Sequence, residues 1–389
     1  MENKERALAH IEKIEWIRPI EGADNIELIG VLGWVCIAKK GEFNVGDMAV
    51  YIEIDSKCPE TDERFAFLAN KKFKVKTMKL GKFKVISQGL ALPLSLFPEL
   101  QDKKIGDDVT EALKITYASE EDAARKTNKI DPNAKYKSMA KRRPKLFANP
   151  IVRRIMRYSI GRKIMFMLFG RKKDNPKKFP DWIVKTDETR IENAPFYLQS
   201  TEKWIKTEKC DGTSCTFAVD RLKKGKNKFD FIVCSRNVRQ ADREQACYHE
   251  SNIYWELADK YDIEKILTQF ATENNYNRVV LQGEGVGSVQ GNPYKFTENK
   301  LFVFNLIIDG IRLGTVEIAD FCKSHGLTSV PIIDTAYELP KTMEEMKLEA
   351  DGYSELNPKV KREGFVYRSI DGQQSFKNVS REYLLKHNG

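Results

Sequence analysis

The strongest constraint on the fold is an interruption: between residues 112 and 148 the sequence loses the strand-like hydrophobic pattern that precedes it and becomes polar. The stretch SEEDAARKTNKIDPNAKYKSMAKRRPK has almost no large apolar side chains, so it cannot bury a core of its own. A chain of 389 residues is long enough for two ordinary domains. The sequence therefore predicts a folded domain over residues 1–111, a basic linker or helical connector over 112–178, and a second folded domain over 179–389.

Short apolar runs rich in Ile and Val fill the first domain, and Gly and Asp separate them: IEKIEWI, IELIGVLGWVCIAKK and GEFNVGDMAVYIEID. This spacing predicts a small β-barrel or sheet. The segment from Phe65 to Leu96 is expected to continue it, with lysines interleaved with phenylalanines. Such strands can present a groove that follows a phosphate backbone, so Lys72, Lys74 and Lys76 are candidate RNA contacts. A solvated strand face whose phenylalanines enter the core is an equally good interpretation.

The third segment has the composition of a globular domain that mixes strands and helices. Strand-like runs such as SCTFAVD, FDFIVCS, RVVLQGEG, KLFVFNLIID and EGFVYRS alternate with two helix-like runs, YHESNIYWELADKYDIEKILTQFATEN and TVEIADFCKSHG. The expected fold class of the whole chain is therefore α+β.

A basic, amphipathic stretch lies just before this domain: residues 141–178 contain fourteen Lys or Arg and one acid, Asp174. Basic residues interrupt its apolar positions too often for a membrane-crossing helix. We expect either a helix that lays Arg153 and Arg154 along an RNA backbone while its apolar side chains pack on the protein, or a structural connector. Contact of residues 150–169 with a membrane surface is the third interpretation.

The amino-acid composition limits the kinds of binding partner and metal site that we expect. Lys and Arg outnumber Asp and Glu by 66 to 56, and the net charge of +10 suits a polyanion such as nucleic acid or an anionic membrane. The seven cysteines form no CxxC pair and the four histidines are scattered, which argues against a zinc site or a disulfide framework. The N-terminus lacks the pattern of a secretory signal, so we expect an intracellular, cytoplasmic protein.

The segment Thr207-Glu208-Lys209-Cys210-Asp211-Gly212 contains a KxDG sequence. A lysine that attacks a nucleotide phosphate must be deprotonated, which neighbouring cations, a bound metal or desolvation can bring about. Gly212 lets the backbone approach a ligand closely. Because KxDG alone is a weak signal, its weight depends on the motifs downstream of it in the chain.

Five further motifs occur in order: SRN (235–237), QGEG (282–285), FVFN (302–305), EGFVYR (363–368) and SFK (375–377). This series resembles the motifs of the covalent nucleotidyltransferases, the polynucleotide ligases and RNA capping enzymes. The resemblance implies that Lys209 is the nucleophile that becomes lysyl-AMP. It also assigns nucleotide contacts to Glu208, Gly212, Arg236, Glu284, Phe304 and Lys377, and metal contacts to Asp211 and Glu363.

Each of these residue types suits its role. Glu284 can accept from ribose hydroxyls, Phe304 can stack on adenine, and Glu363 is a hard oxygen ligand for magnesium or manganese. Arg236 and Lys377 can neutralise phosphate charge while the P–O bond breaks. Taken singly, Phe304 is better explained as a core residue and the two cations as solvated charges, and it is the shared order of the motifs that favours the site roles.

Outside the motifs, residues 33–60, 64–94 and 179–195 resemble the Deinococcus-type RNA ligases. This resemblance implies an N-terminal OB-fold β-barrel that binds nucleic acid, followed by an adenylyltransferase, ATP-grasp-like ligase domain of antiparallel sheets flanked by helices. It places Arg190 on the ATP phosphates. The expected activity is ATP-dependent sealing of a 3′-OH RNA end to a 5′-phosphate in nicked or duplex RNA, through lysyl-AMP and an AMP-capped 5′-phosphate, by a monomer.

The sequence also departs from the pattern of the families that it resembles. Val379 occupies the place of a frequent second lysine in the last motif, so phosphate contacts there are expected to rest on Lys377. The sequence ends soon after that motif, which argues against capping enzymes and ATP-dependent DNA ligases. A capping guanylyltransferase and a catalytically silent RNA-binding module are the alternatives. Deleting residues 1–110 is expected to spare lysine adenylation and to weaken nick sealing.

Overall fold

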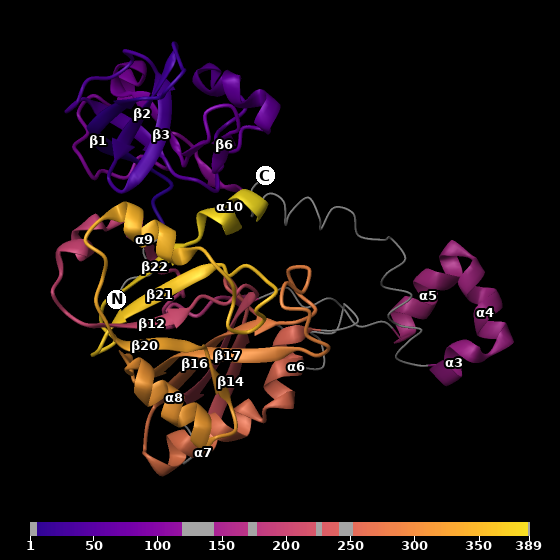
Figure 1. The fold of residues 1–389 in the computed structure, drawn as a ribbon. Helices are drawn as coiled ribbons and strands as arrows, with labels where there is room; N and C mark the ends of the chain where they lie inside the picture. The colour runs from indigo at the N-terminus through magenta and orange to yellow at the C-terminus, as the bar shows by residue number, and fades with distance from the viewer. Residues whose placement is uncertain (1–5, 119–143, 170–176, 223–227, 241–251, 388–389) are drawn as a thin grey trace. The chain divides into compact units, whose positions relative to one another are not determined.

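The computed structural model describes residues 6–118, 144–169, 177–222, 228–240 and 252–387 (Figure 1). Their contacts divide the chain into two units, each built from separate stretches. The lysine unit contains the described residues of 2–124, 187–211 and 330–389, and the sheet unit those of 125–186 and 212–329. The sequence-based division follows chain order and these units do not, because the chain changes unit three times after residue 186. The domain boundaries expected from the sequence stay a prediction.

The N-terminal part of the lysine unit is a curled antiparallel sheet in the strand order β3-β2-β1-β4-β8. The sheet contains β1 (Ala9–Pro19), β2 (Ile26–Val31), β3 (Trp34–Lys39), β4 (Met48–Ile52) and β8 (Leu90–Pro93). Two short pairs accompany it: β5 (Ser56–Lys57) with β9 (Thr116–Tyr117), and β6 (Met78–Leu80) with β7 (Val85–Ser87). The strands predicted from the apolar runs of residues 10–58 are confirmed.

The lysine-rich segment differs from its expectation as a run of strands. Residues Glu63–Lys71 form a 3-10 helix, η1, which begins where the Asp62 carboxylate accepts from the Arg64 amide and ends at Lys72 in a left-handed conformation. Phe65 and Leu68 are buried and Phe67 is exposed, which is helical rather than strand periodicity. Two further 3-10 turns, η2 (Leu94–Leu96) and η3 (Pro98–Leu100), follow β8.

A second sheet of the lysine unit has the order β11-β22-β21-β12-β20. Its strands are β11 (Thr189–Arg190), β22 (Ser375–Val379), β21 (Gly364–Ser369), β12 (Trp204–Glu208) and β20 (Ile332–Tyr337). Short helices border it: η4 (Ile191–Asn193), η5 (Pro195–Gln199), α9 (Met343–Ala350) and α10 (Arg381–His387). Its core is aromatic, and the rings of Tyr367 and Phe376 stack with centroids 5.0 Å apart.

The two sheets of the lysine unit share a core. Val379 and Leu384, from the C-terminal part of the chain, are buried in the same hydrophobic cluster as Trp34. The Gly33 amide donates to the Glu192 carbonyl at 2.8 Å, and the Trp34 indole donates to the Asn193 side chain. The N-terminal sheet is therefore part of the structural support of β22.

The sheet unit contains an eight-stranded, largely antiparallel sheet. Its strands are β10 (Lys177–Lys178), β15 (Val238–Arg239), β14 (Phe229–Cys234), β13 (Thr213–Arg221), β16 (Arg278–Val286), β17 (Lys300–Ile308), β18 (Ile311–Arg312) and β19 (Thr328–Ser329). The helices α6 (Ile253–Lys260), α7 (Ile263–Glu273) and α8 (Thr315–Ser324) pack on one face (Figure 1). Both helix-like runs identified in the sequence are confirmed, the first as two helices that meet at Asp262.

The basic stretch forms three short helices, α3 (Pro144–Ala148), α4 (Pro150–Arg157) and α5 (Ser159–Phe169). The rest of the expected connector, at 119–143 and 170–176, lies outside the described residues. Among the helices that the structure describes, none is both long and apolar enough to cross a membrane.

Candidate active site

Lys209 comes directly after β12, and backbone hydrogen bonds fix its position. Its amide donates to the Gly364 carbonyl at 3.0 Å. Its Nζ donates to Glu363 Oε1 at 2.6 Å, so the first residues of the KxDG and EGFVYR motifs form an ion pair. Gly364 has φ +151°, and a Cβ there would collide with the Asn378 carbonyl, which explains the glycine beside the carboxylate.

Glu208, the residue before Lys209, faces away from this pair. It is buried, and its carboxylate accepts from the Ser354 hydroxyl and from the Glu355 amide at 2.7 Å. Burial raises the pKa of Glu208, and the two hydrogen bonds partly oppose that rise. In this arrangement Glu208 holds the loop at Ser354, and its contact with a nucleotide stays a prediction.

Lys377 lies on β22 and is almost fully buried. Its Nζ donates to Asp187 Oδ1 at 2.7 Å. Burial lowers the pKa of Lys377 to about 8; Asp187 opposes this shift, and the positive charges of Arg190, Arg6 and Lys209 add to it. These cations therefore influence one another, as expected where an anion with several charges binds.

Arg190 lies opposite Lys377 in the parallel pair β11–β22. It is 6% exposed, and its Nη2 donates to Asp55 Oδ2 at 3.0 Å. Its Nε and Nη1 are buried without a hydrogen-bond partner in the described part of the chain. Buried guanidinium nitrogens without partners are costly, and phosphate oxygens are the acceptors that would satisfy them. The predicted contact of Arg190 with the ATP phosphates remains consistent with this geometry.

Sequence reasoning missed the acids that hold these cations. Asp187 belongs to the stretch KTDETR, where its position three residues before Arg190 was the available signal. Asp55 lies in the loop after β4, where its φ of 70° signals a constrained turn that no sequence pattern reveals. Arg6 pairs with Glu53, whose pKa is lowered to about 2 by His10 and Arg6 although burial opposes the shift.

In the sheet unit, Glu284 and Phe304 lie on the neighbouring strands β16 and β17, and both are half-buried. Glu284 pairs with Phe302, and the register slips between Gln282 and Gly283, so Phe304 is the extra residue of a β-bulge. Bulges redirect side chains next to functional sites. The bulge explains why Phe304 is only half-buried in an otherwise apolar strand, where the sequence alone favoured a core position.

Two other predicted site residues of the sheet unit are Gly212, which is half-buried, and Arg236, which is exposed. A Cβ on Gly212 would collide with the Gly285 carbonyl, so the position requires the close backbone approach expected of it. Arg236 is exposed in the turn between β14 and β15, where the Ser235 amide donates to the Val238 carbonyl at 3.0 Å.

The two predicted metal ligands, Asp211 and Glu363, both belong to the lysine unit. Within the described residues, no group of three or more His, Cys, Asp or Glu is arranged to hold a metal ion. Magnesium commonly needs only one or two protein carboxylates when substrate phosphates complete its shell. The two carboxylates therefore fit the expected cation, and their assignment stays a prediction.

The candidate RNA contacts lie on two separate elements. Lys72 is exposed, and Lys74 and Lys76 are half-buried, all in the irregular stretch between η1 and β6 rather than on a strand. Arg153 and Arg154 are exposed on α4. The role of both groups as RNA contacts stays a prediction.

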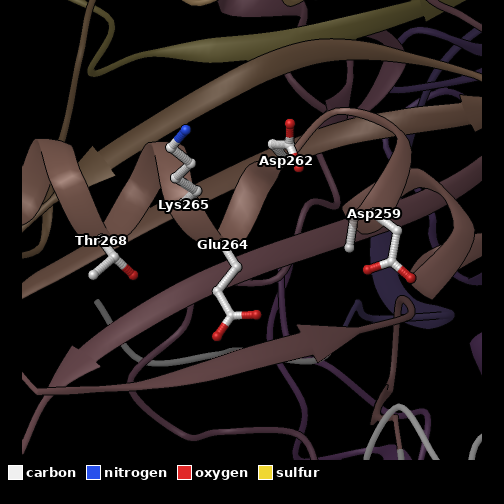
Figure 2. Close-up of a pocket in the computed structure, with 6 residues that line it drawn as sticks. Asp259, Asp262, Glu264, Lys265 and Thr268 are labelled. Carbon is white, nitrogen blue, oxygen red and sulfur yellow. The ribbon is translucent and has the colours of Figure 1, made fainter.

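A hollow of about 500 Å³ lies at the corner between α6 and α7. Figure 2 shows Asp259, Asp262 and Glu264 around it with Lys265 and Thr268. Three carboxylates against one lysine repel a triphosphate, and no predicted site residue lines this hollow. It is therefore not the nucleotide site.

Comparisons with known proteins agree with this geometry. A family model described as an OB-fold domain matches residues 8–94, and one described as RNA ligase matches residues 202–386. No curated protein sequence matches the chain. The solved structure of Naegleria gruberi RNA ligase with pyrophosphate is 32% identical, with a TM-score of 0.75, and the match covers 98% of this chain and 99% of that one. A lysine-to-alanine mutant of that ligase with ATP and Mn is 30% identical, with a TM-score of 0.73 and the same coverage.

Proposed function

The chain belongs to the RNA ligase family, and from that premise we propose that it is an ATP-dependent ligase that seals a 3′-OH RNA end to a 5′-phosphate. The observation that carries the proposal is the pair of Lys209 and Glu363, 2.6 Å apart, beside the buried cations Lys377 and Arg190. A nucleophilic amine next to a carboxylate and an anion-binding cluster is what covalent adenylation requires. The solved N. gruberi ligase structures with ATP or AMP and Mn support ATP as the nucleotide.

The reaction divides into three steps. Lys209 Nζ, as the neutral amine, forms a P–N bond with the α-phosphorus of ATP and gives up one proton to solvent, while the bond to the β-phosphate breaks and pyrophosphate leaves. An oxygen of the RNA 5′-phosphate then attacks the same phosphorus and releases the lysine. The RNA 3′-OH finally attacks the capped 5′-phosphate, loses its proton, and displaces AMP.

The residues of the lysine unit supply the charges for the first step. The ion pair with Glu363 holds the Lys209 side chain, so Glu363 must release Lys209 before Nζ can attack. A divalent cation held by Glu363 and Asp211 would neutralise phosphate charge. Lys377 and Arg190 would bind the phosphates, held in place by Asp187 and Asp55.

The sheet unit would bind the nucleoside. Glu284 would accept from the ribose hydroxyls, Phe304 would stack on the adenine from its bulge, and Arg236 would contact phosphate. The partly exposed positions of Glu284 and Phe304 support these roles, because a core residue would be fully covered.

The first test is nucleotide choice. Incubation with α-labelled ATP or GTP is expected to give a covalent protein adduct with ATP only. An adduct formed from GTP in preference would overturn ligation in favour of RNA capping. No adduct and no pyrophosphate release with either nucleotide and a divalent metal would favour a silent RNA-binding module.

The second test is substrate choice, with nicked duplexes that vary RNA and DNA on each side of the break. We propose that sealing requires RNA on the 3′-OH side and tolerates DNA on the 5′-phosphate side. Equal sealing of an all-DNA nick would contradict the RNA assignment. A sealed product that requires a 5′-hydroxyl rather than a 5′-phosphate would contradict the reaction itself.

A further inference from the structure

The sequence of the helices α3 to α5 contains basic residues and no acidic ones. Between residues 144 and 169 the basic residues are Lys145, Arg153, Arg154, Arg157, Arg162 and Lys163, and the stretch contains no Asp or Glu. On α4 the three arginines lie on one side, and Ile151, Val152, Ile155 and Met156 lie on the other. The charge and the apolar side chains thus face different directions on the same short helix.

The apolar side is only partly covered. On α5, Ile160, Ile164, Met167 and Leu168 are 70%, 47%, 77% and 62% exposed, and their spacing places all four on one face. On α4, Ile151 is 70% exposed and Ile155 is 38% exposed. Exposed apolar residues that follow one face of a helix mark a binding surface more often than scattered ones do. We name these six side chains the apolar stripe.

The local fold explains why the stripe stays outside. Asn149 caps α4 by accepting from the Ile151 amide, and Pro150 begins the helix. A side chain at Gly161 would collide with the Ile155 carbonyl, so glycine permits the close corner between α4 and α5. Met165 is 6% exposed and lies four residues after Gly161, on the same face of α5. The inward positions are thus taken by Gly161 and Met165, and the stripe faces outward in the part of the chain that the structure describes.

The arginines of α4 and the apolar stripe together favour a membrane surface over RNA as the binding partner. An RNA backbone accounts for the arginines, but it requires Ile155, Ile160, Ile164 and Met167 to pack on the protein, and these side chains are exposed. A bilayer surface with anionic headgroups accounts for both features, because the stripe enters the acyl boundary while the basic side chains reach the phosphates. Helices of eight and eleven residues can lie in that interface without crossing it. We propose that residues 144–169 bind the surface of anionic lipid membranes.

The test is flotation of the full-length protein with phosphatidylcholine vesicles that contain or lack phosphatidylserine. The protein is expected to float with the anionic vesicles, to float less with the neutral ones, and to be released by high salt. The triple variant Ile160→Gln, Ile164→Gln, Met167→Gln is expected to lose at least tenfold of the bound fraction and to keep its rate of nick sealing, since none of the three positions belongs to the nucleotide site.

A matched control removes as many exposed apolar side chains elsewhere: Ile311→Gln, Val316→Gln, Leu348→Gln. This control is expected to float like the unaltered protein. The proposal is overturned if the unaltered protein stays unbound with anionic vesicles, or if the α5 triple floats equally well. It is also overturned if the α5 triple keeps flotation and instead weakens binding of a nicked duplex, which would make the stripe an RNA surface. Lysine adenylation, measured on the same samples, reports on the ligase proposal separately.

Discussion

Lys209 and Glu363 are 154 residues apart in sequence, yet Nζ and Oε1 lie 2.6 Å apart. The contact arises because β12 and β21 are antiparallel neighbours, with Glu208 opposite Phe365 at the end of the pair. The register of this strand pair therefore places Lys209 beside the carboxylate of Glu363, with which it forms the ion pair. A shift of one residue in that register would separate them.

Replacing Glu363 with Gln tests the role of this carboxylate. The amide keeps the size of the side chain but removes the charge that holds a cation, so lysine adenylation is expected to fall roughly 100-fold. The rate of adduct formation from labelled ATP measures it. Glu382→Gln is the control, because Glu382 makes an ion pair with Lys361 on the surface. Equal rates for the two variants would contradict the assignment of Glu363.

The pKa of Lys377 predicts a pH dependence of activity. Burial lowers the pKa of Lys377 to about 8, so Lys377 loses its charge as the pH rises through that value. The predicted contact of Lys377 with phosphate weakens with the loss of that charge. Asp187→Asn removes the negative charge that opposes this lowering, so the alkaline decline in sealing is expected to begin at a lower pH. Rates of sealing measured from pH 6 to 10, in both proteins, give the comparison. An alkaline decline at the same pH in both would contradict the coupling of these residues.

The sequence predicts which residues carry the proposed chemistry better than it predicts the helices and acidic side chains that hold them in place. The apolar runs were sufficient to predict the N-terminal strands. The order of the motifs groups Lys209, Glu284, Phe304, Glu363 and Lys377 as one predicted set, and the roles of these residues stay a prediction. The helix η1 was missed because Phe65 and Phe67, two residues apart, also fit the period of a strand, and the tertiary packing of Phe65 and Leu68 decided for a helix. Asp55 was missed because its contact with Arg190 joins residues 135 apart in sequence.

Deletion of residues 1–110 now has a different expected result from the one that the sequence suggested. Because Val379 and Leu384 share a core with the N-terminal sheet, and Asp55 holds Arg190, the deletion exposes apolar surface and frees Arg190, the predicted phosphate contact. Lysine adenylation is expected to fall together with nick sealing, and the remaining chain to unfold at a lower temperature. A truncated protein that adenylates at the original rate, and melts where the full chain does, would show that the shared core is dispensable.

His10 predicts a pH dependence of stability. Burial lowers its pKa, but hydrogen bonds to Glu12 and Glu53 outweigh burial and raise it from 6.5 to about 9. Protonated His10 therefore stabilises the fold fully below pH 6.5, and this stabilisation, on the order of 3 kcal/mol, is lost as the pH rises through about 9. Urea unfolding is expected to show a large difference between the unaltered protein and His10→Gln at pH 6, and a small one at pH 10. A difference that does not change with pH would contradict the charged pair.

The most direct test of the account is the position of the covalent nucleotide. The protein is incubated with ATP and a divalent metal, digested, and searched by mass spectrometry for a peptide that has gained AMP. If Lys209 is the nucleophile, AMP is attached to it through a P–N bond and the Lys209→Ala variant carries no AMP. AMP on another residue, or an adduct that persists in Lys209→Ala, would contradict it.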